Sequence, residues 1–420
     1  MQRFVGLIGI VVILAIAYLM SNNRKKINFK TVGMGFLLQV ALAVFIFKVP
    51  VGRLIFQSIG SFIEKLLTFA IEGGQFVFSG LIKPDFENMF CGGAHIFTLQ
   101  LICSSIFMMI LVNVLYYYGI MQKIVACLGK AMNKLMKVSG AEALCSVANS
   151  FVGQIVAQIM IKPYLKELTR SEVLTCMAGS MACISGAMMP IYIGMGIPAE
   201  YVLASSVMAA PGVFVLTKIM YPEDSEPKTG KNIDIEVEKT HVNVIDSISA
   251  GAADGMNVGI SVTAMIIALV ALVAMIDWIL GGIGTFLYTT CHVGLAWLPD
   301  LSLKFILGKI FAVFALVMGV PLHDVTTVGG LMGEKIVLNE MVAYMDLTSI
   351  PVEQISKKAF LIASFALCSF GNIGSIAVQI GGIGEMAPEQ RKNLAELGVR
   401  ALICGTLTCY MSGAIAGILF

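Results

Sequence analysis

Long apolar runs, separated by short polar stretches, recur along the whole chain. A run of 18 or more apolar residues is long enough to cross the roughly 30 Å hydrocarbon core of a bilayer as a helix. The clearest runs are residues 4–20, 31–47, 97–120, 201–220, 256–286 and 399–420. This pattern predicts an all-α protein, a polytopic transmembrane helical bundle.

Charged residues indicate how the chain is oriented across the membrane and which helices lie at the membrane surface. Four basic residues, Arg24, Lys25, Lys26 and Lys30, follow the first run, and Arg3 alone precedes it. The positive-inside rule therefore predicts an external amino terminus. Residues 51–81 and 121–138 mix charges with apolar positions at helical spacing, which predicts helices that lie in the membrane interface.

Two regions, residues 143–195 and 303–383, share one pattern of apolar and polar positions. Each has an apolar hairpin with a polar tip and then a span interrupted by glycine and polar residues. Re-entrant hairpins and broken helices in inverted repeats are typical of secondary transporters, although residues 143–164 could also form one kinked span. We expect scaffold spans at 1–142, transport repeats at 143–220 and 303–390, a hydrophilic loop with a scaffold span at 221–302, and a final scaffold span at 391–420.

Composition excludes several classes of function. Of the 420 residues, 58% are hydrophobic and 13% are charged, and the formal net charge is +2. Neither the charge nor any basic stripe indicates nucleic-acid binding. The ten cysteines and four histidines are scattered without metal-ligand or disulfide spacing. No catalytic or cofactor motif is present, so we expect a protein that is not an enzyme and has no organic cofactor.

Glu340 is the most informative single residue, because it follows Asn339 inside an apolar helical segment. A carboxylate near the centre of a membrane helix costs about 2.5 to 3.5 kcal/mol. A solute or ion that uses this carboxylate is one explanation for its presence. The alternatives are a structural partner such as Lys335, or a position at the membrane interface.

Asn372 and Ser375 lie three residues apart, and each directly follows a glycine, Gly371 or Gly374. On a helix this spacing places both side chains on one face, where they could bind two hydroxyl groups of one ligand. A packing interface of small residues is the alternative.

At this point the sequence resembles a known family. Residues 338–344 (Leu-Asn-Glu-Met-Val-Ala-Tyr), 364–368 (Ser-Phe-Ala-Leu-Cys) and 370–376 (Phe-Gly-Asn-Ile-Gly-Ser-Ile) are similar to the carboxy-terminal signature of the concentrative nucleoside transporters. Residues 162–165 (Lys-Pro-Tyr-Leu) and 318–321 (Met-Gly-Val-Pro) also match, and the similarity covers essentially the whole chain. It implies a homotrimer in the plasma membrane with a moving transport domain.

The resemblance also implies a substrate site. Glu340, Asn372 and Ser375 match the residues that hold the ribose, and Asn339 and Phe370 beside them are included in the predicted site. A carboxylate can accept hydrogen bonds from two vicinal hydroxyls, while the amide and hydroxyl complete the set.

The first hairpin departs from the family pattern. Family members read the nucleobase with a glutamine, a hydroxyl and a glutamate, and here Gln154 is kept but Ile155 and Val156 replace the other two. Branched alkyl side chains cannot pair a polar substrate edge. Gln158, where the family has proline, is a candidate substitute contact.

The predicted cation site is altered as well. The resemblance implies that Asn149, Val152, Cys183 and Ile184 bind sodium, but Cys183 stands where a hydroxyl residue is usual. A thiol is a poor ligand for a hard cation. Sodium remains the expected coupling ion, and a proton is the alternative.

The sequence thus predicts a cation-coupled secondary transporter that imports nucleosides by alternating access. Two alternatives stay open. The same fold could carry a modified nucleoside or another hydroxyl-rich solute, or the protein could bind its ligand without transporting it.

Overall fold

The computed structural model describes residues 2–82, 97–229, 241–290, 295, 297–298 and 300–420. His95, His292 and residues 230–240 of the predicted hydrophilic loop lie outside this part of the chain. Within it, the regular elements are all helical, which confirms the predicted fold class. The helices are α1 (Gln2–Leu19), α2 (Phe29–Phe47), α3 (Pro50–Phe78), α5 (Phe97–Tyr117), α6 (Ile120–Met136), α7 (Gly140–Val152), α8 (Val156–Ile159), α9 (Arg170–Ala182), α10 (Met189–Gly194), α11 (Ala199–Met220), α12 (Val244–Thr289), α13 (Leu303–Val317), α14 (Val325–Val337), α15 (Glu340–Ser349), α16 (Lys357–Leu367), α17 (Ile373–Met386) and α18 (Arg391–Leu419), with short 3₁₀ turns η1 (Arg24–Lys26), η2 (Ser79–Ile82), η3 (Lys162–Glu167) and η4 (Pro388–Gln390).

Two long helices form the centre of the bundle. Helix α18 packs against α1, α9, α11 and α16, and α11 packs against α2 and α9. Both helices are buried along most of their length, and the start of α1 packs against the end of α18, where a side chain on Gly6 would meet Ile418. The central helices therefore hold the functional elements from both halves of the chain.

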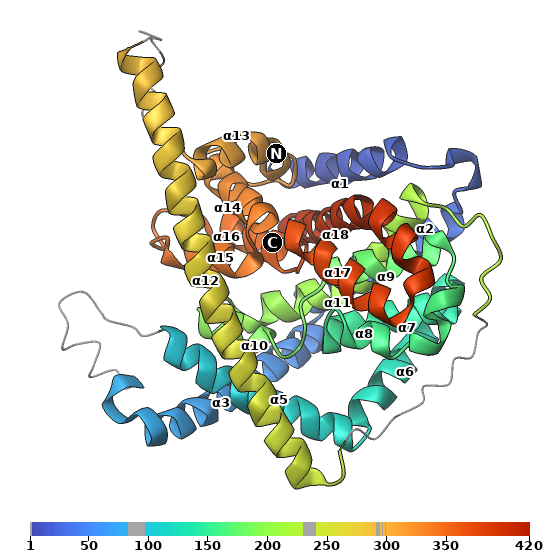
Figure 1. Cartoon of the computed structure of the whole chain (residues 1–420). Helices are drawn as coiled ribbons and strands as arrows, with labels where there is room; N and C mark the ends of the chain where they lie inside the picture. The colour runs from blue at the N-terminus through green and yellow to red at the C-terminus, as the bar shows by residue number, and fades with distance from the viewer. Residues whose placement is uncertain (1, 83–96, 230–240, 291–294, 296, 299) are drawn as a thin grey trace.

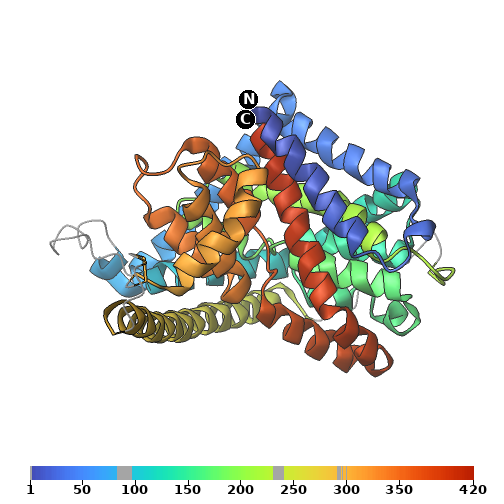
Figure 2. The ribbon, with the colours of Figure 1, turned by 90° about the horizontal axis from the view of Figure 1, so that it is seen from above.

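A peripheral pair of helices, α5 and α12, lies on one side of this centre. They pack closely against each other, and α12 crosses in front of the other helices in Figure 1 and lies along one edge of the molecule in Figure 2. Glycines Gly251, Gly255 and Gly259 allow the contact, because a side chain at either of the first two would collide with the backbone of α5 and one at Gly259 with the side chain of Ile102. The other face of α12 is apolar and exposed, as expected of a lipid-facing or subunit-facing surface.

The order of elements repeats. The first half runs α6, α7, a break, α8, then α9, a break, α10, and finally α11. The second half runs α13, α14, a break, α15, then α16, a break, α17, and finally α18. Each repeat thus contains a broken hairpin, a broken helix and a long buried helix. By this order α18 holds the place in the second half that α11 holds in the first.

Side-chain caps begin several of these helices. Ser139 and Glu142 form a reciprocal capping box at α7, and Thr169 and Glu172 do the same at α9. Ser356 caps α16 in the corresponding place of the second repeat. A cap of this kind stabilises a helix by about 1 kcal/mol because it satisfies amides that the helix leaves unpaired.

Several expected boundaries differ in the structure. Residues 143–164 do not form one kinked span, because α7 ends at Val152 and Gly153 takes a positive φ of 94°. Helix α12 begins at Val244, so it is longer than the predicted span and the hydrophilic loop is shorter. Helix α3 was expected in the interface, yet it is one of six described helices long and apolar enough to cross a membrane.

Candidate functional site

The break between α14 and α15 presents the predicted carboxylate. Helix α14 ends at Val337, and Asn339 caps the start of α15 by accepting a hydrogen bond from the Val342 amide at 3.0 Å. Glu340 is therefore the first residue of a helix, where the backbone amides favour a negative charge. Its side chain is only 5% exposed.

The Glu340 carboxylate accepts a hydrogen bond on one oxygen and keeps the other open. Tyr192 of α10 donates its hydroxyl to Oε1 at 2.8 Å, while Oε2 of Glu340 and Nδ2 of Asn339 have no hydrogen-bond partner among the described residues. Buried polar atoms are normally paired, so these open positions call for a ligand or water. The site can therefore accept hydrogen bonds from a bound solute.

Lys335 lies nearby but does not pair directly with the carboxylate. It is fully buried, its ammonium group has no hydrogen-bond partner among the described residues, and it interacts with Glu340 at longer range. The ammonium lies 3.4 Å from the position that a side-chain carbon on Gly371 would occupy. The structural salt bridge that was the alternative explanation for Glu340 is thus not formed in this state.

The start of α17 brings Asn372 and Ser375 together, but not as two positions on one helical face. Asn372 precedes the helix and caps it, because its Oδ1 accepts a hydrogen bond from the Ser375 amide at 2.9 Å. The Ser375 hydroxyl also lies 3.2 Å from that oxygen and donates to the Phe370 carbonyl. The Asn372 side chain interacts with Glu340 as well. These residues therefore form one polar cluster.

The breaks of the two repeats meet at this cluster. The Phe370 amide, in the break between α16 and α17, donates to the Cys183 carbonyl, in the break after α9, at 3.2 Å. A side chain on Gly371 would lie 2.9 Å from the Met181 carbonyl, so only glycine allows this approach. The unwound backbone of both repeats thus surrounds one site at the centre of the bundle.

The tip of the first hairpin lies along α17. Gln154 accepts a hydrogen bond from Gln379 of α17 at 3.2 Å, and Ile155 packs closely against Gly382. Val156 begins α8 and is 39% exposed. The tip therefore offers one amide and two alkyl groups, as the sequence predicts, and its amide is already bonded to α17.

The four residues of the predicted cation site lie at the ends of α7 and α9. Asn149 is buried, and its Oδ1 accepts a hydrogen bond from Ser180 at 3.0 Å. The Cys183 thiol lies 3.3 Å from the Ser150 hydroxyl and 4.0 Å from the Ser206 carbonyl. The residues offer an amide oxygen and unwound backbone near Val152 and Ile184, which suits a hard cation. The thiol does not suit one, whereas the Ser150 hydroxyl beside it does.

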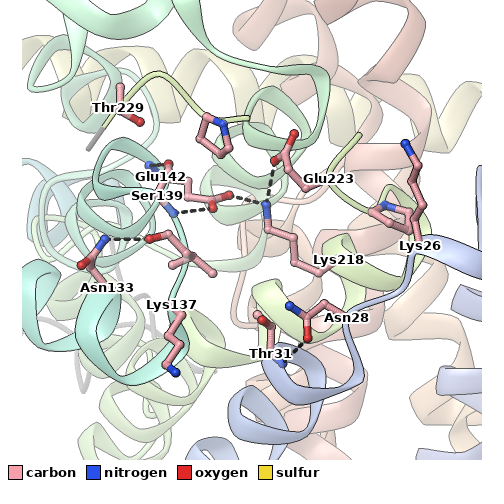
Figure 3. Close-up of a pocket in the computed structure, with 13 residues that line it drawn as sticks. Lys26, Asn28, Thr31, Asn133, Lys137, Ser139, Glu142, Lys218, Glu223 and Thr229 are labelled. Carbon is pink, nitrogen blue, oxygen red and sulfur yellow. Dashed lines mark hydrogen bonds and ion pairs between the residues drawn. The ribbon is translucent and has the colours of Figure 1, made fainter. Parts of the chain in front are cut away.

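A cavity of about 420 Å³ lies elsewhere, at the far end of α7, next to the start of α2 and the segment that follows α11. Thirteen residues line it (Figure 3): Lys26, Asn28, Thr31, Asn133, Lys137, Val138, Ser139, Glu142, Lys218, Pro222, Glu223, Pro227 and Thr229. None of the predicted site residues is among them. Helix α7 has 13 residues, so about 20 Å of helix separates this cavity from the break at Gly153.

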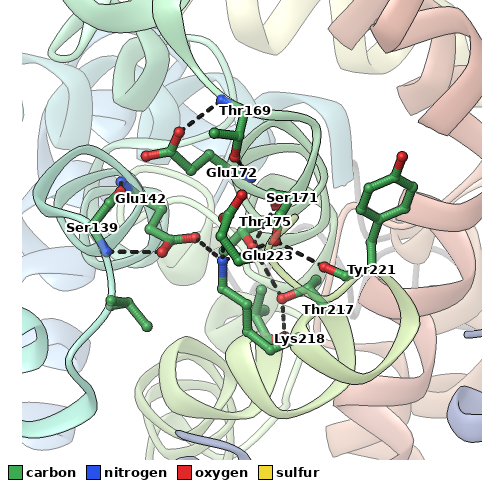
Figure 4. Close-up of polar contacts among 12 residues, drawn as sticks. Ser139, Glu142, Thr169, Ser171, Glu172, Thr175, Thr217, Lys218, Tyr221 and Glu223 are labelled. Carbon is green, nitrogen blue, oxygen red and sulfur yellow. Dashed lines mark hydrogen bonds and ion pairs between the residues drawn. The ribbon is translucent and has the colours of Figure 1, made fainter. Parts of the chain in front are cut away.

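The charges at this cavity compensate one another (Figure 4). Lys218 of α11 is 6% exposed, and its ammonium contacts Glu142 at 2.7 Å, the Ser171 hydroxyl at 3.0 Å and Glu223 at 3.5 Å. Thr229 donates to Glu172 at 3.0 Å. These contacts fasten the segment after α11 onto the starts of α7 and α9. A buried cation with such partners is explained by the fold alone.

The sequence reasoning missed two residues of the site. Tyr192 lies on a six-residue helix in an apolar stretch, and Gln379 is one of several polar residues that interrupt the apolar segment of α17. The polarity of Gln379, two turns beyond Asn372 on the same helix, was a usable signal. The contact of Tyr192 with Glu340 spans 148 residues and no local pattern indicates it.

Three protein-family profiles together match most of the chain. A family profile described as "Na+ dependent nucleoside transporter C-terminus" matches residues 201–417, and one for the "Na+ dependent nucleoside transporter N-terminus" matches residues 8–81. A profile described as "Gate: Nucleoside recognition" matches residues 98–199.

Individual proteins are similar over nearly their full length. The "Uncharacterized transporter YutK" of Bacillus subtilis is 38% identical over 98% of both chains, and the "Nucleoside permease NupC" of Helicobacter pylori is 35% identical over 98% of this chain and 97% of its own. The structure of CNTnw in an inward-facing substrate-bound state has a TM-score of 0.92 and 38% identity, covering 100% of this chain and 98% of that one. A variant of CNTnw in an outward-facing state also has a TM-score of 0.92, with 37% identity and the same coverage.

Proposed function

Because this chain belongs to the concentrative nucleoside transporter family, we propose that it imports nucleosides by alternating access, coupled to the entry of a cation. The chain is a transporter and not an enzyme, and it is a multi-pass protein of the plasma membrane. The observation that carries the proposal is the buried Glu340 carboxylate, one oxygen of which has no hydrogen-bond partner among the described residues, at the meeting point of the two repeats.

The sugar end of the solute is assigned to the second repeat. Glu340 accepts hydrogen bonds from two neighbouring hydroxyls of the ribose, and Asn339 offers its Nδ2, which has no partner within the described chain. Asn372 and Ser375 contribute when they exchange their bonds to each other for bonds to the solute. Phe370 lies with Asn372 in the break between α16 and α17, where its ring can cover an apolar face of the solute. Such polar groups select ligands strongly, since a ligand without the hydroxyls leaves them unpaired.

The base end of the solute is assigned to the first hairpin. Gln154 reads the base there, and Ile155 and Val156 form an apolar wall. This composition supports a second candidate solute, a modified nucleoside whose base carries an apolar substituent. The two candidates share the sugar and differ only in the base.

The coupling ion is assigned to the ends of α7 and α9. Asn149 and the backbone near Val152, Cys183 and Ile184 supply oxygen ligands, and Ser150 provides the hydroxyl that position 183 lacks. Sodium is the expected ion, in keeping with the family description, and a proton is the alternative. One cation that enters down a potential of about 100 mV contributes about 2.3 kcal/mol, which supports roughly 50-fold accumulation of a neutral solute.

Alternating access requires one part of the chain to move against another. The two repeats meet at the proposed solute site, whereas α5 and α12 form a separate pair at the edge. The exposed apolar side chains of α12, such as Trp278 and Ile267, fit a scaffold that contacts other subunits of a homotrimer. The repeats would then move relative to that scaffold.

Uptake into proteoliposomes tests the proposal. A panel of labelled nucleosides, both ordinary and base-modified, is offered with an inward sodium gradient, an inward proton gradient or neither. We expect concentrative uptake of at least one nucleoside under one of the two gradients. Preference for base-modified compounds favours the second candidate solute. Binding without flux, and without counterflow, contradicts transport and leaves a binding protein.

A further inference from the structure

A continuous chain of buried hydrogen bonds connects the proposed base contact with the proposed cation site. It runs from Gln154 to Gln379 at 3.2 Å, from Gln379 to Gln158 at 3.3 Å, from Gln158 to Ser180 at 2.7 Å, and from Ser180 to Asn149 at 3.0 Å. We call these five residues the amide chain. They come from the first hairpin, from α9 and from α17, so the chain crosses both repeats.

Four residues of the amide chain are closed off from solvent, and Gln154 at its end is partly exposed. Gln158 and Gln379 are fully buried, and Asn149 and Ser180 are each 1% exposed. Hydrogen bonds in such an environment are stronger than in water, and each bond constrains the orientation of the next. Gln158 is thus directed to other protein groups, and it lies behind the hairpin tip rather than at its surface.

Ser180 gives this chain three alternative arrangements. Its hydroxyl has one hydrogen but three acceptors within reach: Asn149 Oδ1 at 3.0 Å, the Cys176 carbonyl at 3.0 Å and the Gln154 carbonyl at 3.5 Å. A hydroxyl can donate to only one of these at a time. The hydrogen bond to Asn149 is therefore exchangeable without a change in the backbone.

A cation that binds Asn149 competes with this hydrogen bond. When Oδ1 faces a cation, the Ser180 hydroxyl donates instead to the Cys176 or the Gln154 carbonyl. The amide of Gln158 donates to the same hydroxyl oxygen and to Gln379. The orientation of this amide therefore depends on which acceptor the Ser180 hydroxyl uses. Nε2 of Gln158 also reaches the Cys176 carbonyl at 3.4 Å, and its Oε1 has no partner among the described residues, so only Nε2 holds this amide in place. Gln379 in turn holds the side chain of Gln154.

From these contacts we infer that the amide chain couples cation binding at Asn149 to nucleoside binding at Gln154, with the Ser180 hydroxyl as its switch. The inference rests on the proposed function, because it takes the two ends of the chain from that proposal. Ser180, Gln158 and Gln379 act as positioning residues in this coupling. Coupling of this kind is a change in the affinity for one ligand when the other is present.

Nucleoside binding at several cation concentrations tests the inference. The protein in lipid nanodiscs is titrated with uridine in the absence of sodium and at saturating sodium. A pH series without sodium tests the proton in the same way. The coupling factor is the dissociation constant for uridine without the cation divided by that with the cation, and for linked sites it is about 5 to 150. It is measured for the wild type and for the variants Ser180→Ala and Gln158→Leu.

A matched control separates coupling from general damage to the core. Gln39 of α2 is also fully buried, makes one hydrogen bond, to Ser412 at 2.9 Å, and has an unpartnered Oε1. It lies outside the amide chain. Gln39→Leu therefore removes an equally buried amide and is expected to keep the wild-type coupling factor. Ser180→Ala removes a single oxygen, so it supplies a readout should Gln158→Leu fail to fold.

In both amide-chain variants we expect the coupling factor to fall below about 3, while the affinity of Ser180→Ala for uridine without cation changes by less than about threefold. Wild-type coupling factors in both variants overturn the inference and leave the proposed function intact. Failure of the wild type to bind nucleosides, or binding that ignores both cations, overturns the proposed function and the inference with it.

Discussion

The break between α14 and α15 and the break between α7 and α8 hold matching places in the two repeats, but they carry different side chains. The first of these presents Asn339 and Glu340, polar groups with unpaired atoms in the interior. The second presents Gln154, Ile155 and Val156, of which the amide is bonded to α17 and the others are alkyl groups. One tip is ready to bind a polar group, whereas the other is mostly apolar.

This difference separates two parts of solute recognition. Unpaired atoms beside Glu340 have a cost that only a bound partner removes, so that end of the site demands hydroxyl groups. An alkyl wall demands much less, because an added or missing methylene changes binding by only about 1 to 3 kcal/mol. We therefore expect strict selection of the sugar and loose selection of the base.

The largest expected effect follows from removal of the carboxylate. Glu340→Gln replaces a charged acceptor with a neutral amide that accepts through one oxygen only, and we expect nucleoside uptake to be lost while the protein still folds. Proteoliposome uptake and the thermal unfolding midpoint measure the two quantities. Glu353→Gln, the same change at an exposed position, serves as the control. Full uptake by Glu340→Gln removes this residue from the site.

A smaller effect is expected from restoring polar groups to the first hairpin. The double variant Ile155→Thr and Val156→Glu supplies a hydroxyl and a carboxylate at the tip. We expect the preference between two nucleosides that differ only in the base to change by about tenfold or more, because the new groups are satisfied by one base and not by the other. Competition assays with unlabelled nucleosides measure this preference. An unchanged order of preference contradicts the assignment of the base to this hairpin.

The smallest effect is expected at Tyr192. Tyr192→Phe removes the donor to Glu340 in the free and in the bound protein alike, so it should lower stability by about 1 to 3 kcal/mol and uptake by less than about tenfold. Tyr344 is the matched control, since its hydroxyl is also buried and donates to the Ser364 carbonyl at 2.7 Å. Tyr344→Phe should lower stability without changing nucleoside affinity. Loss of uptake in Tyr192→Phe as complete as in Glu340→Gln would give Tyr192 a direct role in binding.

Local patterns in the sequence predicted the fold class and the polar residues of the second repeat. Apolar runs identify helices that cross or fill a membrane, and an acid in such a run is conspicuous, so the residues around Glu340 were enough to single it out. The break at Gly153 was one of two options and needed the backbone conformation to decide it. The sequence also could not show that Asn372 caps α17 instead of lying on its face.

Contacts between the two repeats could not be predicted from the sequence. Tyr192 meets Glu340 and Gln154 meets Gln379 across separations of 148 and 225 residues, and no periodicity encodes such pairs. The family resemblance supplied the roles of the site residues but not their hydrogen-bond partners. The amide chain, which consists of those partners, could therefore be found only in the structure.

The central claim is that Glu340 and its neighbours bind the neighbouring hydroxyls of a ribose. The most direct measurement compares the affinity of the purified protein for uridine with its affinity for 2′,3′-dideoxyuridine, which differs only in lacking those hydroxyls. We predict that the dideoxy compound binds at least about 100-fold more weakly, because the buried carboxylate is then left unpaired. Equal affinity for the two compounds would contradict the account.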